Sequence, residues 1–135
     1  MANLVEELQG VHYDELIGGT AVSPIIKNVT LSGVTKDTDL ARGTLLALAP
    51  TTGKYSVLVK PTGTVNDTMI AKAVLAKDVH QDGSGDLVVP VYIAGMFNRE
   101  KLIVPAEDTA EVHEEELRDV GIYLTSVKAY RRINK

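Results

Sequence analysis

Short runs of alternating apolar and polar residues, separated by turn residues, make up most of this chain. The longest run is VVPVYIAGMFNREKLIV at positions 88–104, where Val89, Val91 and Ile93 occupy alternate positions. A period of two is typical of a strand with one buried face. The run breaks at Gly95, so we predict two strands joined by a tight corner, AGMFNRE. Pro90 lacks an N–H and therefore predicts an edge strand or a bulge, and an edge is where another chain could pair.

Other apolar runs predict further strands, and turn residues lie between them. These strands are expected at 29–31, 44–49, 55–59, 70–77 and 121–126. The PTTG segment at 50–53 predicts a hairpin turn. The 70–77 run is almost continuously apolar, which favours a strand covered on both faces, although periodicity alone leaves a short helix open.

One helix is predicted near residues 109–120. Asp108 and Glu111 have the spacing of a capping box, and Gly121 supplies a C-terminal stop. Four residues recur at helical spacing on one face: Ala110, His113, Leu117 and Val120. The whole pattern predicts an α+β fold of mostly short strands, resembling a small β-barrel or β-tulip, with one main helix.

The same pattern divides the chain into three parts. Residues 1–27 contain Gly18, Gly19 and Pro24, which oppose a continuous helix or a central strand, so we expect a flexible or extended arm. Residues 28–127 would form the folded domain, and residues 128–135 a basic tail. The arm also carries apolar residues that predict a docking surface: Val22, Ile25 and Ile26.

Composition narrows the classes of function. The chain has 135 residues, which suits one domain, and it has no cysteine, which excludes a disulfide framework and thiolate chemistry. The net charge of -4 argues against a nucleic-acid partner. There is no signal-peptide pattern and no apolar run of about 18 residues, so we expect a soluble, unprocessed protein without a membrane partner.

No motif in the chain predicts catalysis, a metal or a cofactor. His12, His80 and His113 have no companion at ligand spacing, and His113 is expected to be a satisfied inward-facing residue. Gly83-Ser84-Gly85 is too short for a nucleophile elbow. The segment 78–86 has the offsets of a calcium loop, but the twelfth position is Val89 instead of glutamate, so a polar hairpin turn is the preferred interpretation.

An ordered set of segments resembles the bacteriophage head decoration proteins of the lambda protein D type. The matching segments are YDELIGG (13–19), ARGTLLA (41–47), TGKY (52–55), AKAVLAKDV (71–79), VYIAGMFNREKL (91–102) and LRDVGIYL (117–124). Their order and spacing agree from about residue 13 to residue 127. The arm is similar to that of the longer phage and prophage members, and the basic tail is an extension.

The resemblance implies a structural protein, not an enzyme. Members of this family bind the outer surface of the expanded capsid as trimers and stabilise it against internal DNA pressure. The implied partners are the major capsid protein and further copies of this chain, on the virion and in the host cytoplasm during assembly. The implied capsid-binding residues are Tyr13, Asp14, Leu16, Ile17, Val22, Ile25 and Ile26. The expected trimer or edge contacts are Pro90, Phe97, Asn98 and Arg99.

Two other classes remain open from the sequence. A small β-rich phage tail or receptor-adhesion module could use the same edge strand and loops. A hydrolase would require a pocket in which His80 or His113 approaches a carboxylate.

Overall fold

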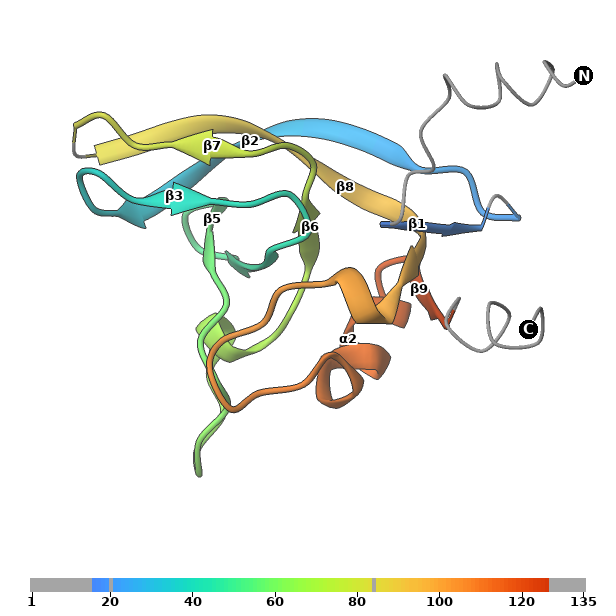
Figure 1. Ribbon diagram of the computed structural model, residues 1–135. Coiled ribbons are helices and arrows are strands. Elements are labelled where there is room, and N and C mark those ends of the chain that lie inside the picture. The colour runs from blue at the N-terminus through green and yellow to red at the C-terminus, as the bar shows by residue number, and fades with distance from the viewer. Residues whose placement is uncertain (1–15, 20, 84, 127–135) are drawn as a thin grey trace, which may run out of the picture.

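The computed structural model describes residues 16–19, 21–83 and 85–126 (Figure 1). In chain order the elements are β1 Ile17–Gly19, β2 Ile25–Val34, β3 Asp39–Leu40, β4 Leu45–Ala49, β5 Lys54–Val57, the 3-10 turn η1 Asp67–Met69, β6 Ala73–Leu75, β7 Val79–His80, β8 Gly85–Asn98, the 3-10 turns η2 Arg99–Lys101 and η3 Ala110–His113, α2 Glu114–Arg118, and β9 Ile122–Thr125. No helix among the described residues is long and apolar enough to cross a membrane.

Strand β8 is the element to which most of the others attach. Its first part pairs with β2 in antiparallel register, and Val91 and Tyr92 also pair with β6 on the other side. Its last part, from Gly95, pairs with β1 in antiparallel and with β9 in parallel orientation. Figure 1 shows β8 running beside β2 across the molecule to the end that carries β1 and β9.

The strand pairings form a circuit, but not a clean barrel. They run from β8 through β2, β5, β4 and β6 and back to β8. The junction of β2 and β5 consists of the single register pair Leu31 and Tyr55, and β3 and β7 form a separate two-stranded sheet. The predicted α+β class with mostly short strands is therefore confirmed, as a sheet of several strands that closes only in part.

Two hydrophobic clusters lie on opposite sides of β8. Val91 belongs to one cluster with Leu31, whereas the neighbouring Tyr92 belongs to the other with Phe97 and Leu117. This alternation follows from the two-residue period of a strand. The Tyr92 and Phe97 rings pack in a tilted arrangement with centroids 5.0 Å apart, a geometry that adds about 0.5–1.5 kcal/mol to the burial of the rings.

The predicted corner at Gly95 is wrong, because β8 continues without interruption to Asn98. Gly95 has φ 140°, and a side chain there would meet the Phe97 ring and the Pro24 Cα at 3.1 Å. Glycine therefore allows the strand to pass from one set of partners to the next. The chain turns only at η2, after which Ile103 forms a single parallel bridge with Thr44.

Pro90 does not lie at a sheet edge, contrary to the sequence-based expectation. It pairs with Asn28 of β2, and its carbonyl accepts a hydrogen bond from the Ala76 N–H at 3.0 Å on the opposite side. In an antiparallel strand the N–H and C=O of one residue point to the same side. The missing N–H therefore faces the end of β6, where pairing stops, and no bond to β2 is lost.

The predicted boundary between an arm and a domain at residue 28 is also wrong for the described residues. Strand β2 begins at Ile25 and crosses this position without a break, and β1 is hydrogen-bonded to β8. Leu16 is buried in the core. The paired strands therefore extend into the predicted arm, whereas residues 1–15 and the basic tail 128–135 lie outside the described residues.

The predicted helix is confirmed as η3 followed by α2, and Gly121 ends it with φ 93°. The inward positions of His113 and Leu117 are confirmed as well, since both are fully buried. The capping box is not formed. Asp108 Oδ1 accepts a hydrogen bond from the Thr109 N–H, while the Asp108 N–H donates to the Pro105 carbonyl. The other carboxylate oxygen of Asp108, Oδ2, contacts His113 Nε2 at 2.7 Å.

Gly18 provides a test of how β1 is held. A Cβ at this position would lie 2.9 Å from Asn98 N and Phe97 C and would also meet Thr125 Oγ1. We expect Gly18→Ala to lower the free energy of unfolding by about 1–3 kcal/mol, because these atoms cannot separate without disturbing the strand pairing. Chemical denaturation would measure this. Gly63→Ala is the matched control, because no atom lies within 4 Å of that Cβ. Equal stability of the two variants would contradict the close packing of β1.

Candidate interaction surface

Three segments meet at the last part of β8 and form one end of the molecule (Figure 1). Strand β1 pairs with Phe97, β9 pairs with residues from Gly95 to Asn98, and Ile25 at the start of β2 pairs with Ala94. Thr125 Oγ1 donates to the Gly18 carbonyl at 3.2 Å and so joins β9 to β1. Segments from near the start and near the end of the described residues therefore come together here.

Ile25 and Ile26 are the most exposed large apolar residues of this end, and the β2–β8 register shifts between them. Their side chains are 52% and 57% exposed, although they are adjacent in a hydrogen-bonded strand. Two further predicted capsid-binding residues, Val22 and Ile17, are half-buried. Four of the predicted capsid-binding residues are thus at least partly accessible. Leu16 is not, because its side chain is part of the core, and Tyr13 and Asp14 lie outside the described residues.

The predicted trimer or edge residues occupy a different environment from the one expected. Phe97 has no exposed surface, and Asn98 is buried and caps η2 by accepting a hydrogen bond from the Glu100 N–H at 3.1 Å. The expectation of a surface contact is therefore wrong for these two side chains. The reason is that the presumed corner is the buried end of β8.

Arg99 is half-buried and fixed by hydrogen bonds. Its guanidinium donates to both carboxylate oxygens of Glu114, at 3.0 and 3.2 Å, and to the Leu124 carbonyl at 3.3 Å. A bidentate arginine–carboxylate pair is among the stronger polar contacts in proteins. Arg99 therefore connects η2, α2 and β9 within the chain.

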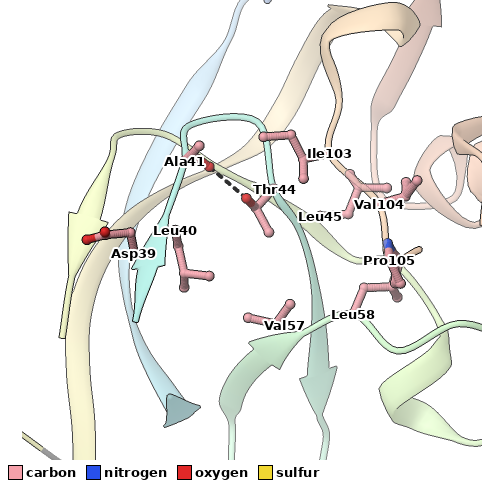
Figure 2. A pocket seen from close by; sticks show the side chains of 10 residues that line it. All are labelled: Asp39, Leu40, Ala41, Thr44, Leu45, Val57, Leu58, Ile103, Val104 and Pro105. Carbon is pink, nitrogen blue, oxygen red and sulfur yellow. Dashed lines mark hydrogen bonds between the residues drawn. The ribbon is translucent and has the colours of Figure 1, made fainter. Parts of the chain in front are cut away.

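An apolar groove lies between the β3–β4 segment and the chain after η2 (Figure 2). Its volume is about 280 Å³. Leu45 and Leu58, which are buried, form its floor. Figure 2 shows Leu40 on one side and Ile103 on the other. Thr44 also lines the groove, and its hydroxyl donates to the Ala41 carbonyl at 2.7 Å. The groove was not predicted, because its walls come from segments far apart in the sequence.

A buried cluster of a histidine and two carboxylates lies beside the helix. His113 has no exposed surface, and its ring nitrogens contact Asp108 Oδ2 and Glu116 Oε1, each at 2.7 Å. Glu116 Oε1 also accepts the Ala71 N–H at 2.9 Å, which links the helix to the segment that leads into β6. Two carboxylates need two N–H donors, so the geometry favours the imidazolium form of His113.

The same cluster determines the charge of His113. Burial by itself would lower the pKa of His113, but the hydrogen bonds to Glu116 and Asp108, together with their negative charges, outweigh burial and raise the pKa above its ordinary value. The sequence predicted a satisfied histidine. It did not identify its partners, because Asp108 and Glu116 were assigned to a capping box and to a solvated face.

His80 lies in a separate, exposed group on the β3–β7 sheet. Its Nδ1 is 2.5 Å from Asp39 Oδ1, and its Nε2 is 3.4 Å from Asp82 Oδ1. The hydrogen bond to Asp39 is the largest cause that raises the pKa of His80 above its ordinary value; desolvation opposes it, and the charges of Asp39, Asp82 and Asp37 add to it. The chain then turns around Gln81, which is buried and accepts the Gly83 N–H at 3.2 Å. Among the described residues no group of three or more His, Asp and Glu side chains is placed to hold a metal ion.

Comparisons with known proteins do not assign this chain to a family. No protein-family model matches the sequence, and no curated protein matches it.

The His113 cluster predicts how stability depends on pH. Because the pKa of His113 is raised in the folded state, the stabilisation is complete below the unfolded pKa of about 6.5 and is lost as pH rises through the folded pKa. We expect His113→Gln to lower the free energy of unfolding by about 3 kcal/mol at about pH 6, since the buried Asp108 carboxylate and the partly buried Glu116 carboxylate lose a charged partner, and by less at about pH 9.

Urea denaturation at both pH values measures this difference. His80→Gln is the matched control, because the exposed His80 should contribute little at either pH. A destabilisation by His113→Gln that is equal at the two pH values would show that the ring is not charged in the folded protein.

Proposed function

We propose that this protein is a phage capsid decoration protein, which binds the outside of the expanded head as a trimer and stabilises it against internal DNA pressure. The proposed partners are the major capsid protein and two further copies of the chain. The observation that carries the proposal is the exposed pair Ile25 and Ile26 at the end where β1 and β9 meet. The ordered resemblance between residues 13 and 127 supports the capsid as the partner.

The local architecture suits recognition by strand addition. Strand β1 pairs with β8 along one edge, and no other described strand pairs with β1. An unpaired edge can take up an extended segment of another chain, with backbone hydrogen bonds providing affinity and neighbouring apolar side chains providing selectivity. Ile25 and Ile26 lie on β2, which β8 separates from β1 in the sheet, and they would supply an apolar contact at the same end of the molecule.

Trimeric placement would add affinity without a strong single contact. Ordering a chain segment costs about 1–2 kcal/mol per residue, so one copy would bind weakly. Three copies held together raise the effective concentration of each contact after the first. A complete site on the expanded head would then be required for stable binding, which gives a physical basis for decoration after expansion.

Both histidines approach carboxylates, as a hydrolase would require, but neither lines the apolar groove, and the geometry of His113 argues against a base at that position. Both ring nitrogens of His113 contact carboxylates inside the protein, and both nitrogens of His80 face aspartates. A general base needs one nitrogen within hydrogen-bond reach of a nucleophile or a water molecule. His113, which is fully buried with both nitrogens engaged, instead has the surroundings of a structural cation.

Substitution of the exposed pair tests the proposed contact. We expect Ile25→Ser combined with Ile26→Ser to weaken binding to expanded heads by at least about tenfold, since burying one isoleucine contributes about 1.5–3 kcal/mol and 1.4 kcal/mol corresponds to tenfold in affinity. Co-sedimentation with expanded heads that lack a decoration protein measures the binding. Substitutions are preferable to truncation at residue 28, which would remove β1 and the first residues of β2.

Val88→Ser is the matched control, because Val88 is 75% exposed on the same strand pair but lies away from this end. It should bind as the unchanged protein does. Equal binding of the double variant would move the contact elsewhere on the molecule. Failure of the unchanged protein to bind any expanded head would contradict decoration and favour a phage tail or adhesion module.

A further inference from the structure

The apolar groove is preformed and partly open. Its rim at Ile103 is held by two backbone hydrogen bonds, from Ile103 N to the Gly43 carbonyl at 2.9 Å and from Leu45 N to the Ile103 carbonyl at 3.0 Å. Nevertheless the Ile103 side chain is 42% exposed. A fixed concave surface lined by leucine, valine, isoleucine and proline has more to gain from an apolar occupant than from water.

The size and chemistry of the groove indicate what kind of occupant it fits. Its volume of about 280 Å³ is just below the range of about 300–1,000 Å³ that is usual for small-molecule sites. The only charged residue in its lining is Asp39, which already contacts His80. The groove therefore offers few polar groups to orient a metabolite, but it can accept one or two apolar side chains of a peptide segment.

The described chain begins beside this groove. Leu16 packs in the same cluster as Leu45 and Leu58, which form the groove floor. A Cβ at Gly43, the residue before the groove-lining Thr44, would lie 3.6 Å from the Leu16 Cδ1. Fifteen residues precede Leu16 in the sequence. An extended chain covers about 3.3–3.6 Å per residue, so Val11 can reach about 17 Å from Leu16.

These fifteen residues carry apolar side chains in a suitable pattern. Leu4, Leu8 and Val11 are spaced as i, i+4 and i+7, which places them on one face of a helical turn. The residues between them include Glu6, Glu7 and Gln9, which would remain in water.

We propose that the groove between Leu40 and Ile103 is the docking site for residues 1–15 of the same chain, with Leu8 and Val11 as the inserted side chains. The rival occupant from this chain, residues 127–135, is less suitable because it carries four basic residues among its nine. The inference does not depend on the proposed function. Ile25 and Ile26 do not line the groove, so capsid binding and groove docking can fail separately.

Site-specific labelling tests the docking in the full chain. The sequence has no cysteine, so Ile103→Cys introduces a single thiol at the groove rim. We expect this thiol to react with a maleimide several-fold faster when Leu8→Ser and Val11→Ser are also present, because the rim is then uncovered. Val88→Cys, with or without the two serine substitutions, is the control, and its rate should not change. Equal rates at position 103 in both backgrounds would overturn the proposal.

A spin label identifies the occupant. Attached at Val11→Cys, it should broaden the methyl signals of Leu40 and Ile103 of the same chain and leave those of Val88 unaffected. A mixture of spin-labelled chains and isotope-labelled chains without cysteine distinguishes docking within one chain from docking by a second copy. Broadening in this mixture would show that a second copy supplies the segment, and broadening by a label at Tyr130→Cys alone would assign the groove to the C-terminal residues. Either result would overturn docking by residues 1–15 of the same chain.

Discussion

Strand β8 must serve two sets of partners, and this requirement organises the whole fold. Up to Ala94 the strand pairs with β2, and from Gly95 it pairs with β1 and β9. The change occurs at φ 140°, and the Gly95 N–H donates to the Gly121 carbonyl at 3.1 Å. A Cβ at position 95 would crowd the Pro24 Cα and the Phe97 ring at 3.1 Å, in a backbone conformation that favours glycine. The passage of β8 from β2 to β1 and β9 therefore depends on a residue without a Cβ.

Local sequence patterns were sufficient to predict most short elements. They failed where the residue type at a position is explained by contacts with a distant part of the chain. Alternation and turn residues correctly indicated β4, β5, β9 and the helix, because each depends on its own burial pattern. Gly95 was interpreted as a corner and Pro90 as an edge, since glycine and proline usually interrupt strands. Their actual roles depend on Pro24, Asn28 and Ala76, which lie on other elements. Such pairings cannot be read from one segment.

The candidate site was predicted in part for the same reason. The exposure of Ile25 and Ile26 follows from apolar residues in a segment with little core of its own. The burial of Phe97 does not, because it depends on three strands converging around it. The carboxylate partners of His113 were not predicted, for the same reason. Glu116 has the local pattern of a solvated helix residue, yet its carboxylate reaches the Ala71 N–H, 45 positions away.

Several polar contacts lie close to the end of the molecule that carries Ile25 and Ile26. They explain how a small protein could present a rigid surface there. Arg99 holds α2 to β9 through Glu114 and the Leu124 carbonyl, while Glu116 holds the helix to the segment that leads into β6. Thr125 then joins β9 to β1. A surface fixed before binding loses less conformational entropy in the complex, and more of the apolar contact energy remains as affinity. If the proposed contact is correct, these charged and polar residues contribute to it indirectly, by limiting the movement of the strands that carry Ile25 and Ile26.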